Sequence, residues 1–142
     1  MIDERLIWFR TVLMAAVGGI VALLGGWDAV LEVLVTLMVL DYVCGVGQAV
    51  LDHRLSSAVG FKGILKKAGY LMLVMVACLF DRAMQFQEPL SRTVILLFLI
   101  ANESLSILEH LAIFGVPVPK WLLERLQKLQ EQHDTSPGSR PG

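Results

Sequence analysis

The sequence predicts an all-α integral membrane protein with about four transmembrane helices and a C-terminal amphipathic helix. Apolar residues make up 56% of the 142 residues and charged residues only 18%. The mean hydropathy is +0.66. These values exceed what the core of a soluble domain of this length needs. The apolar residues also gather into long stretches, and one shorter segment near the C-terminus has a helical apolar strip.

Four stretches are long enough to span a bilayer, because a helix needs about 20 mainly apolar residues to cross the hydrocarbon core. The predicted spans are residues 6–26, 29–51, 69–86 and 93–114. The first two are separated only by "GGWD", so they form a tight helical hairpin if both cross. The third is the shortest. A three-span arrangement, with the first segment at the interface or the third failing to cross, stays open.

Lysine and arginine residues favour four spans with both termini in the cytoplasm, since short cytoplasmic loops retain basic residues. In that arrangement only Arg82 and Arg92 fall outside. The basic residues that fall inside are Arg5, Arg10, Arg54, Lys62, Lys66, Lys67, Lys120, Arg125, Lys128 and Arg140. A three-span chain would put one of these clusters on the wrong face.

The first span carries small residues three and four positions apart. They are Ala15, Gly18, Gly19 and Ala22, continued by Gly25 and Gly26. Such patterns let helix backbones approach closely in lipid. This predicts a helix-packing face, although glycine is also simply commoner in membrane helices than in soluble ones.

The second span, in the segment "LDYVCGVGQAVLD", has one small and polar face. Asp41, Gly45, Gln48 and Ala49 recur on it at helical spacing. Of these, Gly45 and Ala49 are predicted helix-packing positions, and Asp41 and Gln48 are predicted to line a pore or to join helices.

The fourth span carries a polar stripe in "NESLSILEHL". Its members follow helical i, i+3, i+4 spacing and are Asn102, Glu103, Ser106, Glu109 and His110. If ionised and facing lipid, Asp41, Glu103 and Glu109 would together cost on the order of 8 kcal/mol. They therefore either form polar contacts that hold helices together or line a water-filled path. Polar faces on two spans favour the water-lined or pore-forming role.

Two further segments are predicted to lie at the membrane surface. After the prolines of "GVPVP", residues 119–132 form an amphipathic helix, whose apolar strip includes Trp121, Leu122, Leu126 and Leu129. This helix fits either the interface or a neighbouring helix. The loop "LDHRLSSAVGFKGILKK" would be a poor stable helix alone because of Gly60 and Gly63, and its Arg54, Lys62, Lys66 and Lys67 would be attracted to anionic headgroups. We expect residues 1–133 to form the membrane domain and residues 134–142 to be a disordered tail.

Little in the chain indicates an enzyme. Cys44 and Cys78 lie in apolar stretches and match no metal or redox spacing. His53, His110 and His133 are scattered, and no glycine-rich phosphate loop is present. We therefore expect no catalytic residue, metal or cofactor. The net charge of −1 gives no basic field for nucleic acid.

Three segments together resemble the toxin-secretion and phage-lysis holin family of Gram-positive bacteria and their phages. They are "LDYVCGVGQA", "SSAVGFKGILKKAGYLMLVMVACLFD" and "NESLSILEHLAIFGVPVPKWLLERLQKL", between about Val35 and Leu129. The positions that match the family are Asp41, Gly45, Ala49, Ser56, Gly60, Gly63, Lys66, Lys67, Asp81, Glu103, Ser106, Glu109, Pro117 and Pro119. The chain departs from the family at Cys44, where threonine is common, and at His110, where asparagine is common.

The resemblance implies a homo-oligomer that forms lesions in the bacterial cytoplasmic membrane and releases an endolysin or a toxin. The expected partners are the lipid bilayer, other copies of the chain, and a peptidoglycan hydrolase or exported toxin. Two alternatives remain: an antiholin-type regulator that shares the spans, and a small ion channel or transporter subunit.

Overall fold

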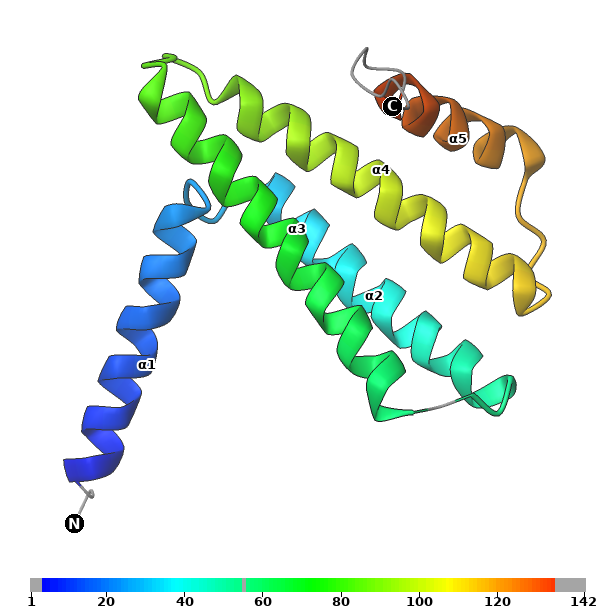
Figure 1. Ribbon diagram of the computed structural model, residues 1–142, viewed down its shortest axis with the longest axis horizontal. Helices are drawn as coiled ribbons and strands as arrows, with labels where there is room; N and C mark the ends of the chain where they lie inside the picture. The colour runs from blue at the N-terminus through cyan, green and yellow to red at the C-terminus, as the bar shows by residue number, and fades with distance from the viewer. Residues whose placement is uncertain (1–3, 55, 135–142) are drawn as a thin grey trace, which may run out of the picture.

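The structure of this chain, a computed structural model, describes residues 4–54 and 56–134, which form five α-helices (Figure 1). The helices are α1 (Glu4–Leu23), α2 (Ala29–Leu51), α3 (Ser57–Ala83), α4 (Leu90–Ile113) and α5 (Lys120–Asp134). These ranges contain no strand, and α1 to α4 are each long and apolar enough to cross a membrane. The predicted all-α membrane fold is confirmed. Of the predicted tail, only Asp134 lies within the described residues.

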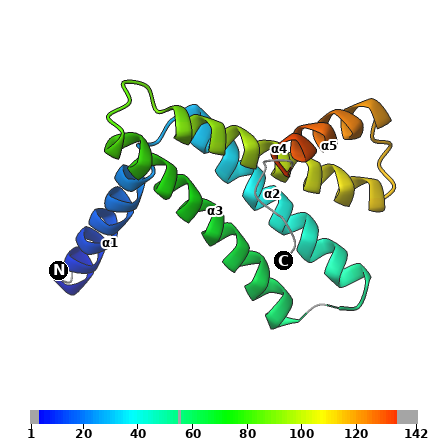
Figure 2. The ribbon, with the colours of Figure 1, turned by 45° about the horizontal axis from the view of Figure 1, so that its top comes forward.

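Helices α2, α3 and α4 form a bundle in which α4 packs against both of the others. The core consists of the apolar residues Leu31, Leu34 and Met38 of α2, Val74 and Cys78 of α3, and Leu96 and Leu99 of α4, together with Leu24. Most other apolar side chains point outward, as expected where lipid rather than water surrounds the protein. Contacts between α2 and α3 are few. Figures 1 and 2 show these two helices diverging toward the loop that joins them.

The α1–α2 and α3–α4 turns meet at one end of the bundle, called here the hairpin end. A carboxylate from α3 caps α4 there, because Pro89 offers no side-chain cap. Asp81 accepts hydrogen bonds from the backbone N–H groups of Ser91 and Arg92, each over 2.9 Å. Asp28 caps α2 by accepting from the N–H of Leu31 over 2.9 Å. Both caps satisfy donors that a helix start leaves unpaired.

Helix α1 stands apart from the bundle (Figure 1). None of its residues is buried, and it touches the rest of the chain only near its C-terminal end, against α3. A Cβ atom added at Gly18 or Gly19 would meet nothing within 4 Å. At Gly18 and Gly19 the predicted packing face of α1, which also includes Ala15 and Ala22, therefore has no neighbour within the described part of this chain, whereas the carbonyl of Ala22 accepts a hydrogen bond from Arg82 of α3.

The boundaries of α2 agree with the predicted span to the residue, whereas α3 begins 12 residues before the predicted start at residue 69. Ser56 caps it by accepting from the N–H of Val59 over 3.3 Å. The segment predicted as a loop, in which Gly60 and Gly63 would make a poor helix alone, is therefore the first part of α3. Both glycines pack against Tyr42 of α2, where an added Cβ would meet the tyrosine at 3.4 Å. Tertiary packing thus outweighs the low helix propensity of glycine.

Helix α5 turns back beside α4 after the proline-containing loop (Figures 1 and 2). Leu122 and Leu123 are half-buried, whereas Trp121 is exposed. The side chains of Leu126 and Leu129, predicted for the same apolar strip, lie outside what the structure describes. The contact with α4 fits the predicted alternative of docking on a neighbouring helix.

Candidate functional site

The polar faces of α2 and α4 meet at Lys67, which α3 contributes from between them. The ammonium of Lys67 donates a hydrogen bond of 2.6 Å to Oδ2 of Asp41 and another to Oε2 of Glu103. The side chain of Glu103 is 0% exposed, and those of Asp41 and Lys67 are 13% exposed. These three residues, one from each bundle helix, are called here the charged cluster. It carries a charge of −1 when all three groups are ionised.

The members of the charged cluster lie at a similar distance from the hairpin end. Asp41 is 13 residues from Asp28, Lys67 is 14 residues from Asp81, and Glu103 is 11 residues from Arg92. A helix rises 1.5 Å per residue, so each lies about 17–21 Å along its helix. In a hydrocarbon core about 30 Å thick, the cluster lies well inside the membrane.

The cluster leaves two buried oxygens without a hydrogen-bond partner among the described residues, Oδ1 of Asp41 and Oε1 of Glu103. The Nε2 atom of His110 lies 3.6 Å from the Asp41 oxygen, which is long for a hydrogen bond. A buried acceptor without a donor costs about 1–3 kcal/mol. The arrangement therefore has unused capacity for water or a proton.

Other predicted polar residues extend this site along α4. Asn102 donates to the hydroxyl of Tyr70 over 2.8 Å, and Nδ1 of His110 lies 2.7 Å from Oε1 of Gln48. Ser106 is half-buried on the same helix. Glu109 is exposed and lies apart from the cluster. The structure thus places His110 against α2 and Asn102 and Glu103 against α3, whereas Glu109 is exposed.

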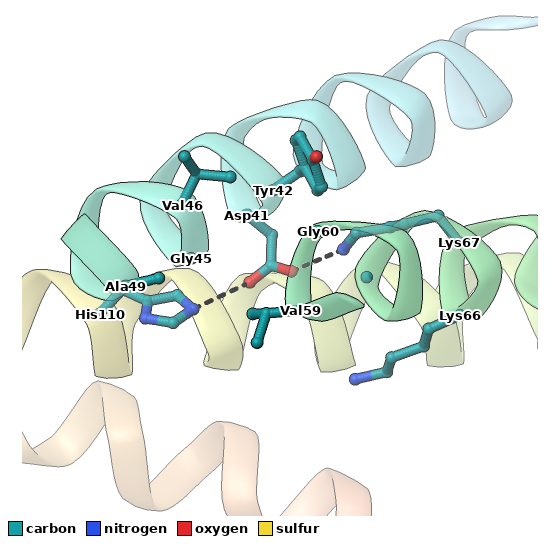
Figure 3. A pocket seen from close by; sticks show the side chains of 11 residues that line it. Asp41, Tyr42, Gly45, Val46, Ala49, Val59, Gly60, Lys66, Lys67 and His110 are labelled. Atoms are coloured by element: carbon teal, nitrogen blue, oxygen red, sulfur yellow. Dashed lines mark hydrogen bonds and ion pairs between the residues drawn. The ribbon is translucent and has the colours of Figure 1, made fainter. Parts of the chain in front are cut away.

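Lys67 is placed differently from the membrane surface predicted for it, because it points between the helices and pairs with two carboxylates. Arg54, Lys62 and Lys66 are exposed. In Figure 3, Lys67 reaches toward Asp41 while the neighbouring Lys66 turns away. Adjacent residues point about 100° apart on a helix, so two consecutive lysines have different surroundings.

A cavity of about 160 Å³ lies beside the charged cluster, between the diverging ends of α2 and α3 (Figure 3). It is called here the wedge. Asp41, Lys67 and His110 border it, together with apolar residues and glycines of both helices. Gly45 and Ala49, the predicted packing residues of α2, line the wedge. An added Cβ at Gly45 would lie 3.8 Å from His110.

A second polar cluster, at the hairpin end, was not predicted as a site. Arg92 is 5% exposed, and its guanidinium donates to the carbonyls of Leu24 at 2.7 Å and Gly26 at 3.2 Å. It also donates to Asp28 over 2.6 Å. Arg82 donates to the carbonyl of Ala22 over 2.9 Å. These bonds tie the α1–α2 turn to α3 and α4.

The Arg92 hydrogen bond holds the pKa of the Asp28 carboxyl below its ordinary value, against the opposing effect of partial burial.

The described residues contain no group of three or more histidine, cysteine or acidic side chains that would hold a metal ion. Both cysteines are free, with Cys78 buried in the core and Cys44 half-buried. The chemistry of the site is thus that of buried ion pairs between helices.

Comparison with known proteins finds similarity over most of the chain. The sequence profile of the bacteriophage holin family matches residues 18–131, a range that contains α2, α3, α4 and the charged cluster. The chain belongs to the bacteriophage holin family. Its membership and its four apolar helices make it a multi-pass membrane protein.

Relatives of this holin-family chain occur in bacteria and in a phage. An uncharacterized protein of Clostridium perfringens is 36% identical over 110 residues, which cover 78% of this chain and 82% of the relative. One from Halalkalibacterium halodurans is 34% identical over 132 residues, covering 90% and 96%. A protein of Bacillus phage phi105 named a probable holin is 33% identical over 104 residues, covering 73% and 76%. No solved structure matches the chain.

Proposed function

We propose that this chain is a holin that accumulates in the bacterial cytoplasmic membrane, assembles with further copies of itself, and opens lesions that let an endolysin or a toxin cross. Membership of the bacteriophage holin family and the similarity to a probable phage holin support this role.

The observation that carries the proposal is the charged cluster within the apolar bundle. In lipid, ionised groups must pair or meet water. A single chain hides Asp41, Lys67 and Glu103 between its own helices. When subunits assemble and the helices separate, the same side chains line a water-filled lesion with the polar stripe of α4. The dormant and open states then differ in whether the cluster is paired or hydrated.

The surfaces of the chain supply a means of assembly. Helix α1 has no buried residue and presents Ala15, Gly18, Gly19 and Ala22. Small residues allow close helix packing in lipid. We therefore assign α1 to contacts between subunits.

The proposed orientation places both termini and the α2–α3 loop in the cytoplasm. Arg54, Lys62 and Lys66 lie exposed near this loop, and basic residues are retained on that side. Arg82 and Arg92 at the hairpin end are then outside. There Arg92 donates to Asp28 and to the carbonyl of Leu24, and Arg82 donates to the carbonyl of Ala22.

Induced expression in a bacterium, with a membrane-impermeant dye in the medium, tests the function. A holin gives a period of normal growth and then abrupt dye uptake. Continued growth of cells that hold the protein in their membranes in an equal amount would instead indicate an antiholin-type regulator. Ion leakage without dye uptake would indicate a small channel or transporter subunit. Lysis should also require a peptidoglycan hydrolase, so dye uptake without lysis is expected when none is present.

A further inference from the structure

The wedge between α2 and α3 is open beside the charged cluster, although its walls are largely apolar. Val46 and Ala49 line it from α2, and Val59, Gly60 and Gly63 line it from α3. The glycines provide the space, because side chains at these positions would reach toward Tyr42. Apolar walls hold water poorly and favour hydrocarbon.

Two further polar groups, besides Asp41, Lys67 and His110, border the same wedge. The Lys66 side chain is exposed, and its ammonium lies 5.6 Å from the centroid of the Tyr70 ring. Within residues 4–54 and 56–134, Lys66 forms no ion pair, in contrast to Lys67. The Tyr42 hydroxyl likewise makes no hydrogen bond to a described residue. The wedge thus combines an apolar interior with a positive charge that is paired with no carboxylate among the described residues.

The position of Lys66 along α3 places this charge near a membrane surface. Lys66 is 15 residues from Asp81 at the hairpin end, or about 22 Å along the helix. A hydrocarbon core about 30 Å thick therefore ends about 8 Å beyond Lys66 on the opposite side. A lysine side chain at this depth extends its ammonium to the headgroups while its stem stays in apolar surroundings.

We propose that the wedge binds an anionic phospholipid, with an acyl segment between α2 and α3 and the phosphate group at Lys66. The bilayer is the surrounding solvent of these helices, so a lipid is always available to fill the space. The charge of Lys66 selects an anionic headgroup, and Tyr42 supplies a hydroxyl donor. A bound acyl segment also shields Asp41 and Lys67 from water on the wedge side. This binding site is independent of whether the chain forms lesions.

Lipid retention by the purified full-length chain tests the site. The protein in detergent is incubated with equal amounts of phosphatidylglycerol and phosphatidylcholine of the same acyl composition, and bound lipid is measured by native mass spectrometry. The wild-type chain should retain phosphatidylglycerol in preference by about fivefold, the size expected for one lysine near an anionic group. Lys66→Gln should abolish the preference. Lys62→Gln, which alters an exposed lysine of the same helix outside the wedge, should keep it.

A second pair of variants tests the apolar part. Gly63→Leu fills the wedge and should remove retention of both lipids, whereas Gly69→Leu faces open space on the same helix and should leave retention unchanged. Circular dichroism checks that each variant is helical, and if Gly63→Leu is not, the Lys66→Gln comparison decides. Equal retention of both lipids by the wild-type chain would overturn the proposal. So would a Lys66→Gln variant that behaves like Lys62→Gln.

Discussion

Lys67 of α3 donates a hydrogen bond of 2.6 Å to Asp41 of α2, a residue 26 positions earlier in the chain. Only 13% of each side chain is exposed. Lys67 also binds Glu103 of α4, so one ammonium joins all three helices of the bundle. The polar stripes of α2 and α4 therefore meet through a cation from a third helix at Asp41 and Glu103, and they meet directly where His110 contacts Gln48.

One ammonium cannot fully neutralise two carboxylates. With either acid removed, the cluster becomes a simple pair of opposite charges. With the lysine removed, two carboxylates remain in apolar surroundings, and leaving a buried charge without its partner typically costs about 3–5 kcal/mol. Replacing one of the two carboxylates and replacing the lysine by apolar residues should therefore move the timing of lesion formation in opposite directions.

Glu103→Leu should insert normally but abolish or greatly delay dye uptake, because it leaves a neutral Asp41–Lys67 pair and an apolar α4 surface. Asp41→Leu should do the same by leaving the Glu103–Lys67 pair. Glu103→Gln keeps shape and hydrogen bonding and should shift timing more mildly. Dye uptake is measured at equal membrane levels of each variant.

Glu109→Leu serves as the matched control for Glu103→Leu, since it removes an exposed carboxylate from the same helix. Its timing should stay near that of the wild type. If both Glu103→Leu and Asp41→Leu also keep wild-type timing, the cluster is only a structural clasp.

Lys67→Leu should advance dye uptake or prevent stable accumulation, because Asp41 and Glu103 are left without their cation. Adding Asp41→Leu and Glu103→Leu to this variant should restore accumulation, since an apolar set can replace a buried ionic one without loss of stability. The triple variant should nevertheless form no lesions. Immunoblots of membrane fractions and dye uptake measure the two effects, and a stable Lys67→Leu variant with delayed uptake would contradict the charge argument.

The sequence predicted polar stripes on α2 and α4, because helical spacing alone places residues on one face of a helix. It did not predict the role of Lys67. The pair Lys66–Lys67 precedes an apolar stretch and looks like a membrane-surface cluster, and Gly60 and Gly63 argue against a helix there. Only the packing of these glycines on Tyr42 shows that the helix continues and that Lys67 points inward.

The hairpin-end contacts were also beyond sequence reasoning. Arg92 is 64 residues from Asp28 and 68 residues from Leu24, and no periodicity connects positions on different helices. The "GGWD" segment predicted a tight turn, but it did not predict that the Arg92 side chain binds this turn. A lone arginine at the start of a span is usually interpreted as an orientation signal, and in this fold it also holds a turn in place.

Gly25→Ala should destabilise the chain more than Gly26→Ala. Both glycines have positive φ values, of 84° and 94°, so both substitutions incur backbone strain of about 1–2 kcal/mol. Only at Gly25 would the new Cβ also meet the Arg92 side chain, at 2.7 Å from Nε. Thermal unfolding in detergent compares the two, and equal midpoints would show that Arg92 adapts freely.

Low pH should weaken the ion pair between Arg92 and Asp28. The pKa of Asp28 lies below its ordinary value of 3.8 because Arg92 donates to the carboxylate. The unfolded chain therefore takes up this proton first, so the stabilisation is complete above 3.8 and is lost as the pH falls through the lowered pKa. Asp28→Asn should remove this part of the pH dependence of unfolding, whereas Asp52→Asn, an exposed carboxyl at the other end of α2, should leave it unchanged. If the free energy of unfolding changes with pH in the same way for the wild type and for Asp28→Asn, the ion pair with Arg92 does not contribute as proposed.

The proposed orientation predicts which exposed positions impermeant reagents reach in intact cells. Ser57 near the α2–α3 loop and Gln87 in the α3–α4 turn are both exposed, so a cysteine at either position reports its side of the membrane and not its burial. In a background with Cys44 and Cys78 replaced by alanine, a cysteine at Gln87 should react with an impermeant maleimide, and one at Ser57 should react only after the membrane is disrupted. The basic residues near the α2–α3 loop are the physical reason, because they are retained in the cytoplasm. Labelling is read by mass shift before any dye uptake begins, and early reaction at Ser57 would reverse the orientation or remove a span.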